Sequence, residues 1–311
     1  MATPKAEDAL AIALVQVTKR YRRVTALDRV SFSVPFGRCL GLVGPNGAGK
    51  TTIFRILSGL VGRFEGEATI DGRSVREDRP PVGAIVEAPG FYPYLSVAGN
   101  LRYFAAMSGA PAGRPDDVMA LLGLRGLGAR KAGTLSHGMR QRLGLALALL
   151  TGSRVLLLDE PMTGLDPLVQ HEVRETLRQH VAEGAAVLIS THNLPEVEAL
   201  ADVFVFLKAG RVLAAATRED ILHDGTLSVQ IRRAEEARRV IEAAGHEVLA
   251  VRGTGLVVRC RDGARGEDVA RVLAGAGLYA SAMQERRGSL EDFYLDVMGA
   301  EGSPGPEVVE P

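Results

Sequence analysis

A glycine-rich segment between an apolar run and a helical run places the strongest constraint on how this chain can fold. CLGLV (39–43) is apolar, GPNGAGKT (44–51) follows it, and apolar residues recur at helical spacing through 51–60. In a strand–loop–helix unit of this kind, backbone amides of the loop and of the helix start surround an anion. The pattern GxxxxGK[ST] predicts a nucleotide phosphate site, where Lys50 neutralises charge and Thr51 offers its hydroxyl to Mg²⁺. The helix should bury one apolar stripe, namely Ile53, Ile56, Leu57 and Leu60.

The first 225 residues alternate short β-rich runs with helical patterns, which is typical of an α/β domain with a mainly parallel sheet. The strands that we expect include AIALVQV (11–17), CLGLVG (39–44), VLLLD (155–159) and AAVLIS (185–190). The last two are almost wholly apolar, as strands covered on both faces are. Short helical pieces punctuated by Gly and Pro begin after residue 88 and predict a helical insertion at about 88–150.

The sequence HDGT (223–226) predicts a domain boundary, so that residues 1–225 form the first domain. Beyond it, strand-like and helical runs follow in the order βαββαβ, which predicts a small ferredoxin-like α+β unit over 226–300. This unit should end in the helix SLEDFYLDVMG (289–299). The final residues, 301–311, are rich in Gly, Pro and Glu and are predicted to be disordered.

Composition and charge argue against several classes of function. The formal net charge is +0 and 24% of the residues are charged, so no global field favours nucleic acid and none is expected as a partner. Cys39 and Cys260 lie in apolar strand-like runs and are expected to be reduced packing residues. Glu7 and Asp8 lie where an export signal would be positively charged, and polar residues interrupt the most apolar stretch, 143–158. We therefore expect a soluble, cytoplasmic protein whose role at a membrane would depend on a separate partner.

Two adjacent carboxylates end the apolar run in VLLLDEP (155–161). Open α/β sheets bind ligands at the carboxyl ends of their strands, where the glycine-rich loop also begins. Because side chains alternate along a strand, Asp159 and Glu160 are expected to point to opposite sides. Asp159 would then take part in the Mg²⁺ shell, and Glu160 would act as general base on an attacking water. The alternative is an acidic pair that merely ends a strand.

Two further segments are candidates for contact with phosphate. His192 ends another apolar run, in LISTHN (188–193), and its imidazole could reach the terminal phosphate and orient the water. A lone histidine is more often structural or an exposed loop residue. In LSHGMRQRLG (135–144), Ser136 occupies an N-cap position and Gly138 keeps the backbone approachable, so this helix start is predicted to bind a second anionic group.

The order GPNGAGKTT, LSHGMRQR, LLLDEP, TGLDP and STHN resembles the ATP-binding subunit of an ABC transporter, over about residues 10–215. The resemblance implies a P-loop NTPase fold, with an antiparallel β subdomain and the helical insertion added to the parallel sheet. It implies ATP hydrolysis with Mg²⁺ by a dimer of two copies, in which Lys50, Glu160 and His192 are catalytic. The nucleotide-binding residues implied in the loop are Gly44, Pro45, Asn46, Gly47, Ala48, Gly49, Lys50, Thr51 and Thr52.

The same resemblance implies contacts outside the loop. Tyr21 falls where the family stacks an aromatic ring on adenine. Ser136 and Gly138 fall where the family reaches the γ-phosphate of the ATP held by the second copy, and Asp166 falls in the loop that crosses between subunits. Each ATP would thus be held between two chains, and its hydrolysis would open the dimer.

Some positions depart from the usual family pattern. The helix-start motif reads LSHGM where the family usually has LSGGQ, so His137 and Met139 are expected to slow turnover or weaken dimer closure. Glu87 stands where most members have a glutamine, and this form, followed by a Tyr-Pro pair, is similar to the bacitracin- and lantibiotic-resistance branch of exporters. A carboxylate is a good Mg²⁺ ligand, so we expect Glu87 to contact the metal. The alternative is that Glu87 is a surface carboxylate.

The aromatic segment GFYPYL (90–95) either docks a membrane subunit or belongs to the insertion's own core.

Taken together, the resemblance implies the ATPase subunit of an exporter, on the inner face of the cell membrane, that works with an integral membrane permease. The alternative is a soluble ABC-type ATPase of DNA repair or translation. Those proteins usually carry two cassettes in one chain, or long coiled-coil or zinc-binding insertions, which this sequence lacks. A P-loop kinase or GTPase would leave LSHGMRQR without a role.

Overall fold

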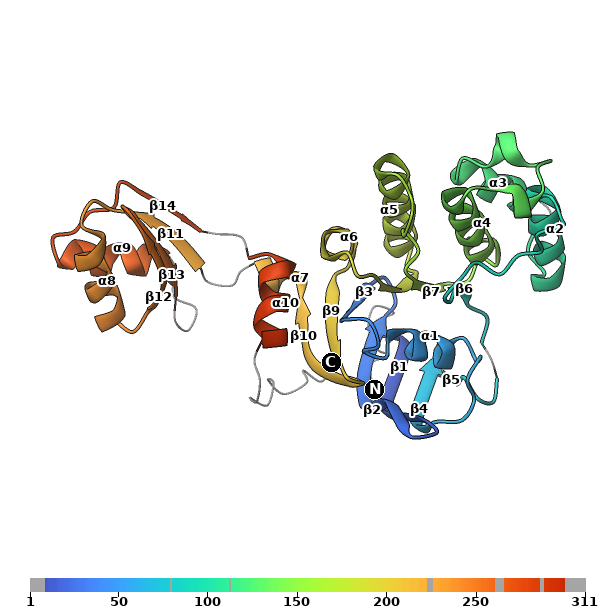
Figure 1. Ribbon diagram of the computed structural model, residues 1–311, viewed down its shortest axis with the longest axis horizontal. Coiled ribbons are helices and arrows are strands. Elements are labelled where there is room, and N and C mark those ends of the chain that lie inside the picture. The colour runs from blue at the N-terminus through green and yellow to red at the C-terminus, as the bar shows by residue number, and fades with distance from the viewer. Residues whose placement is uncertain are drawn as a thin grey trace, which may run out of the picture. The chain divides into compact units, whose positions relative to one another are not determined.

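The computed structural model describes residues 9–78, 80–111, 113–222, 226–260, 266–285 and 288–299 (Figure 1). The described residues form two compact units, the first up to Ala216 and the second within Thr217–Gly299. The division therefore lies before the boundary that HDGT predicts, and residues 223–225 of that segment lie outside the described residues. The predicted disordered tail, 301–311, also lies outside them.

A six-stranded sheet forms the centre of the first unit, in the order β10-β9-β3-β8-β7-β6. Its strands are β3 (Cys39–Val43), β6 (Gly83–Ile85), β7 (Val155–Asp159), β8 (Ala186–Ser190), β9 (Val203–Lys208) and β10 (Arg211–Thr217). The pairs β9–β3, β3–β8, β8–β7 and β7–β6 are parallel. Every residue of β3, β7 and β8 is buried, as expected for strands with both faces covered. The carboxyl ends of these three strands therefore meet at one edge of the sheet.

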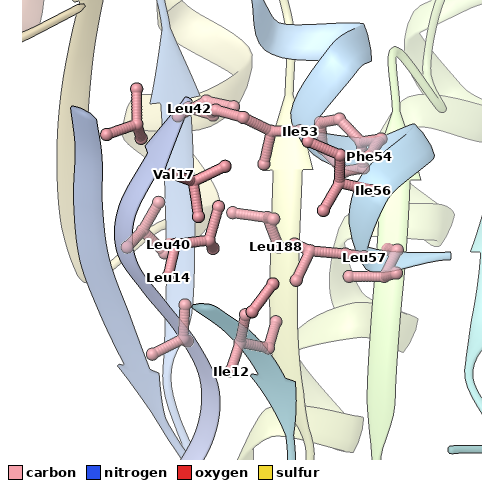
Figure 2. Packing of buried hydrophobic residues seen from close by; sticks show 14 of the residues in the cluster. Ile12, Leu14, Val17, Leu40, Leu42, Ile53, Phe54, Ile56, Leu57 and Leu188 are labelled. Atoms are coloured by element: carbon pink, nitrogen blue, oxygen red, sulfur yellow. The ribbon is translucent and has the colours of Figure 1, made fainter. Parts of the chain in front are cut away.

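A second, four-stranded sheet in the order β2-β1-β4-β5 packs over one face of the parallel sheet. Its strands are β1 (Leu10–Tyr21), β2 (Val24–Pro35), β4 (Glu65–Ile70) and β5 (Arg73–Ser74), and the pairs β1–β2, β1–β4 and β4–β5 are antiparallel. Figure 2 shows the shared core, where Ile12 and Leu14 of β1 lie against Leu40 of β3 and Leu188 of β8. This core supports the strand and the helix on both sides of the glycine-rich loop.

Helix α1 (Lys50–Leu57) inserts into the same core, with Ile53, Phe54 and Ile56 fully buried (Figure 2). The prediction that Leu60 continues this buried stripe is wrong, because Leu60 is 68% exposed. The helix ends before it, since Gly59 adopts a left-handed φ of 75° and its N–H donates to the Ile56 carbonyl oxygen at 3.0 Å.

Helices cover the opposite face of the parallel sheet (Figure 1). They are α4 (His137–Leu150), α5 (Pro167–Ala182) and α6 (Leu194–Leu200), which contact β6, β8 and β3 respectively. Helices α2 (Val97–Ser108) and α3 (Arg114–Leu121) pack on α4, and all three belong to the segment that connects β6 to β7. Short 3₁₀ turns at Arg125–Leu127 and Ala132–Thr134 lead into α4.

The second unit has its own sheet, in the order β12-β13-β11-β14 with antiparallel pairs throughout. Its elements are α7 (Arg218–Leu222), β11 (Thr226–Gln230), α8 (Ala234–Ala243), β12 (Glu247–Arg252), β13 (Gly255–Arg259), α9 (Gly266–Gly275), β14 (Ala282–Glu285) and α10 (Leu290–Gly299). Apolar side chains of α8 and α9 share a buried core with β11 and β13. Helix α7 contacts α10, which explains why the unit begins earlier than predicted.

In the part of the chain that the structure describes, no helix combines the length and apolar character needed to cross a membrane.

Candidate functional site

The glycine-rich loop Gly44–Gly49 connects β3 to α1 and is held closely by neighbouring backbone. A Cβ on Gly44 would lie 2.3 Å from the carbonyl oxygen of Leu207, so only glycine fits there. Gly49 has a left-handed φ of 111°, and a Cβ on it would lie 2.8 Å from the Ala26 carbonyl oxygen. The other predicted loop residues divide into an exposed group, Pro45, Asn46 and Gly47, and a buried pair, Ala48 and Thr52.

Lys50 begins α1 and turns its side chain back over the loop. It is 7% exposed, and its Nζ donates to the carbonyl oxygens of Gly44 at 2.6 Å and Pro45 at 3.1 Å. Burial lowers the pKa of Lys50 from its ordinary value, while the nearby carboxylates of Glu160 and Asp159 act in the opposite direction and favour the ammonium. A buried cation in a glycine-rich loop before a helix start suits an anionic ligand.

Thr51 and Asp159 meet where α1 begins and β7 ends. The Thr51 hydroxyl donates to Asp159 Oδ2 at 2.9 Å, and Asp159 is 6% exposed. The other carboxylate oxygen, Oδ1, accepts a hydrogen bond from the hydroxyl of Ser190, the residue opposite Asp159 in the parallel β7–β8 pair. The structure thus joins two residues predicted as metal ligands.

Glu160 follows β7 directly, and its direction is not set by strand alternation as predicted. The strand ends at Asp159, and Glu160 adopts a left-handed φ of 50° that is uncommon for a residue with a Cβ. Its N–H donates to the hydroxyl and carbonyl oxygens of Ser190, at 3.2 and 3.1 Å. Its carboxylate accepts a hydrogen bond from Thr163 at 3.2 Å and lies 3.2 Å from Nδ1 of His192. The predicted base and the predicted histidine are therefore neighbours.

Glu87 follows β6 closely and contacts α1. It too has a left-handed φ, of 65°, and its carboxylate forms an ion pair with Arg55. Arg55 is one helical turn after Thr51 and lies on the same side of α1. Among the described residues, Glu87 makes no hydrogen bond with Thr51 or Asp159, so the structure does not join the third predicted metal ligand to the other two.

The second predicted anion site is the start of α4. Ser136 is exposed and caps the helix, its hydroxyl oxygen accepting from the Met139 N–H at 3.4 Å. Gly138 packs against Gly164, where a Cβ would lie 3.1 Å from the carbonyl oxygen. Within the described ranges, neither Ser136 nor Gly138 forms a hydrogen bond with Gly44–Gly49.

The two remaining predicted residues lie at the ends of elements. Asp166 caps α5, because its Oδ1 accepts from the Val169 N–H at 3.1 Å. Tyr21 ends β1, is 37% exposed, and has the Lys19 ammonium 4.6 Å from its ring centroid. Tyr21 pairs with Val24, the first residue of β2. Two residues later in β2, the carbonyl oxygen of Ala26 lies beside Gly49 of the phosphate loop.

Sequence reasoning missed two buried polar residues that contact Glu160. Ser190 is fully buried and bridges Asp159 and the Glu160 N–H. Gln141, 6% exposed, donates from Nε2 to the Glu160 carbonyl oxygen at 3.1 Å. The available signal was weak: Ser190 is a polar residue at the end of the apolar run AVLIS, and Gln141 stands between Arg140 and Arg142, ahead of the apolar run LGLALALL.

The chain is similar to subunits of ABC transporters. The family model of ABC transporters matches residues 27–163. The lantibiotic transport ATP-binding protein SrtF of Streptococcus pyogenes is 38% identical over 196 residues, which are 63% of this chain and 86% of SrtF. The ABC transporter ATP-binding protein YdbJ of Bacillus subtilis, whose function is uncharacterized, is 35% identical over 292 residues, which are 91% of this chain and 94% of YdbJ.

A solved structure of an ATP-binding subunit of an ABC transporter has the same fold, with a TM-score of 0.64 and 30% sequence identity. The similarity covers 68% of this chain and 91% of the solved one. Together with the phosphate loop, the paired carboxylates and the capped start of α4, these similarities show that the chain belongs to the ABC transporter family and is one of its ATP-binding, ATP-hydrolysing proteins.

Proposed function

We propose that the chain is the ATPase subunit of an exporter, acting as a dimer of two copies with a separate integral membrane permease. The observation that carries this proposal is the placement of two pairs at the carboxyl edge of the parallel sheet. Thr51 lies against Asp159, and His192 lies against Glu160, with Lys50 and the phosphate loop beside them. Such an arrangement has separate groups for binding phosphate, holding a metal and activating water.

Each side chain at the carboxyl edge of the parallel sheet suits one step of ATP hydrolysis. Lys50 and the loop amides would bind the β- and γ-phosphates of ATP. Glu160 would accept the proton of the attacking water, since a carboxylate beside a histidine is an acceptor that is already oriented. His192 places Nδ1 at Glu160, which leaves Nε2 for the water or the terminal phosphate. Tyr21 would stack on the adenine.

The oxygens of Thr51 and Asp159 fit Mg²⁺. This ion usually takes one or two protein carboxylates and completes its shell with water and phosphate oxygens. The Thr51 hydroxyl and the Asp159 carboxylate are hard oxygen ligands only 2.9 Å apart, next to the phosphate loop. Bound there, Mg²⁺ would neutralise phosphate charge. We propose Glu87 as a further ligand. To bind the metal, its carboxylate would have to leave its ion pair with Arg55.

Ser136, Gly138 and Asp166 would act on the nucleotide of the second copy. Ser136 is an exposed helix cap, and helix starts attract anions. Two ATP molecules would then lie between two chains, and cleavage of the γ-phosphate would remove the contacts that hold the chains together.

The helical insertion offers a surface for the permease. Tyr92 packs against Tyr103 and Phe104, with ring centroids 5.1 and 5.8 Å away, while Tyr94 and Met107 are 68% and 71% exposed. Aromatic and Met side chains are enriched in protein interfaces. The segment thus supports both alternatives at once, an aromatic core and an exposed docking edge. The protein would lie on the cytoplasmic side of the membrane, and the second unit, Thr217–Gly299, would form an accessory domain.

Replacing Glu160 by Gln tests the proposed mechanism. Glu160→Gln keeps the size of the side chain but removes the base, so kcat should fall on the order of 10²- to 10⁴-fold. ATP should still bind, and size-exclusion chromatography with Mg-ATP should show a stable dimer. Glu172→Gln, the same change on the exposed surface of α5, is the matched control and should hydrolyse ATP normally. A Glu160→Gln protein that stays monomeric with saturating Mg-ATP would contradict the dimeric site.

A further inference from the structure

Gln141 is a buried polar residue that the proposed mechanism leaves without a role. It lies in the second turn of α4, among the apolar side chains that pack this helix on the sheet. A buried amide is unfavourable unless it is hydrogen-bonded. Its Nε2 donates to the carbonyl oxygen of Glu160 at 3.1 Å, so the bond ties α4 to the residue proposed as general base.

Glu160 depends on such contacts because its backbone conformation is unfavourable by itself. A left-handed φ of 50° in a residue with a Cβ persists only where the surroundings impose it. Ser190 of β8 binds the N–H of Glu160, and Gln141 of α4 binds its carbonyl oxygen. Both peptide groups next to the Glu160 Cα are therefore held, and they determine the direction in which the side chain leaves the backbone.

The start of α4 contacts the same loop at further points. The imidazole of His137 lies so close to Gly164 that a Cβ there would be 2.2 Å from its Cδ2 atom. Nη2 of Arg142 lies 3.8 Å from Oδ2 of Asp166. Helix α4 therefore contacts residues 160–166 at the beginning, in the middle and at the end.

We propose that Gln141 is a positioning residue for ATP hydrolysis. Its hydrogen bond to the Glu160 carbonyl sets the direction in which Glu160 presents its carboxylate, and makes that direction follow the position of α4. Helix α4 is capped by Ser136, so the segment that would contact the partner's nucleotide also orients the chain's own base. This inference rests on the proposed function, in which Glu160 activates water.

The first experiment replaces Gln141 by Met in the full chain, which keeps the length of the side chain and removes the donor. We expect kcat to fall about tenfold or more, because a buried carbonyl oxygen loses its partner. The Kd for Mg-ATP, measured by titration calorimetry, should change less than about twofold, since the phosphate loop is on another element.

The matched control is Gln170→Met. Gln170 donates to the carbonyl oxygen of Leu165 in the same loop, at 3.3 Å, but does not contact Glu160, so its kcat should stay within about twofold of wild type.

The second experiment uses Gln141→Glu, which has the same shape but can donate only when it is protonated. Burial raises the pKa of a carboxyl group, so lowering the pH from about 8 to about 6 should increase the kcat of Gln141→Glu relative to wild type. A role in stability alone would change the folded fraction, measured by circular dichroism, and would leave the ratio of kcat per folded enzyme flat. The pH series also decides the question if Gln141→Met folds poorly.

The outcomes separate the two proposals. A wild-type chain that binds Mg-ATP but does not hydrolyse it would overturn the proposed function, and this inference with it. An active wild type, together with Gln141→Met that retains wild-type kcat or loses no more than Gln170→Met, would overturn the positioning role alone. A flat ratio for Gln141→Glu would do the same.

Discussion

Ser190 donates to one oxygen of Asp159 and accepts from the N–H of Glu160, although its side chain is fully buried. A single hydroxyl thus holds the proposed metal ligand and the proposed base in one arrangement. Glu160 and Glu87 both have left-handed backbones, and such strain is typical of functional sites, where the surrounding contacts impose it. At the scale of single residues, the site depends on contacts that satisfy buried polar groups.

Ser190→Ala tests this dependence. Oδ1 of Asp159 loses its donor, so we expect kcat to fall about tenfold and the free energy of unfolding to fall by about 1–3 kcal/mol. The control is Ser153→Ala. Ser153 donates to the Pro81 carbonyl oxygen at 2.8 Å, before the opposite end of β7, and its loss should affect stability but not kcat. Steady-state ATPase assays and urea unfolding give both quantities, and a wild-type kcat in Ser190→Ala would refute the role.

At the scale of elements, α1 connects the phosphate loop to the shared core of the two sheets. Its apolar side chains contact β7 of the parallel sheet and β4 of the antiparallel sheet, and they share one buried core with β1 and β8 (Figure 2). Because Lys50 and Thr51 begin this helix, the core that holds its later turns also fixes where they lie. The geometry of the site therefore depends on packing that has no chemical role.

Phe54→Ala measures this support. Phe54 is fully buried, and removing its ring should lower the free energy of unfolding by about 3–5 kcal/mol and weaken ATP binding. Leu60→Ala, three residues beyond the end of the helix at an exposed position, should change stability by less than about 0.5 kcal/mol. Urea unfolding followed by circular dichroism compares the two variants, and equal losses would show that α1 is not held as described.

At the scale of the whole molecule, the proposed site is complete only when two copies meet. Lys50 and the phosphate loop form one part of the proposed site, and Ser136 and Gly138 form another. Among the described residues, no hydrogen bond joins these two parts. A charge-assisted hydrogen bond contributes about 1.5–3 kcal/mol. About two such bonds at each of two nucleotides would favour association by at least ~6 kcal/mol, or on the order of 10⁴-fold.

Ser136→Arg should block this association without preventing nucleotide binding. In the Glu160→Gln background, we expect the protein to remain monomeric in analytical ultracentrifugation with Mg-ATP, while its Kd for ATP changes less than about threefold. Ser96→Arg is the matched control, because Ser96 caps α2 by accepting from the Gly99 N–H at 3.0 Å and has no place in the proposed interface. Dimerisation of both double variants to the same extent would exclude a role for Ser136.

Much of the first unit could be predicted because its signals are local. The runs at 39–44, 155–159 and 185–190 correspond to β3, β7 and β8, since a wholly apolar run of that length is typical of a buried strand. Leu60 was predicted wrongly because an apolar residue at helical spacing says nothing about Gly59, whose left-handed backbone ends the helix first.

The sequence by itself determined the ligand class and the fold family, because the phosphate loop, the acidic pair and the capped helix start are short motifs whose backbone requirements are met within a few residues. Only the tertiary structure decided which side chains hold these motifs in place. Ser190, Gln141 and Arg55 each act on a glutamate or aspartate that is far away along the chain. Such contacts depend on how strands and helices pack in space, and no local pattern of residues encodes that.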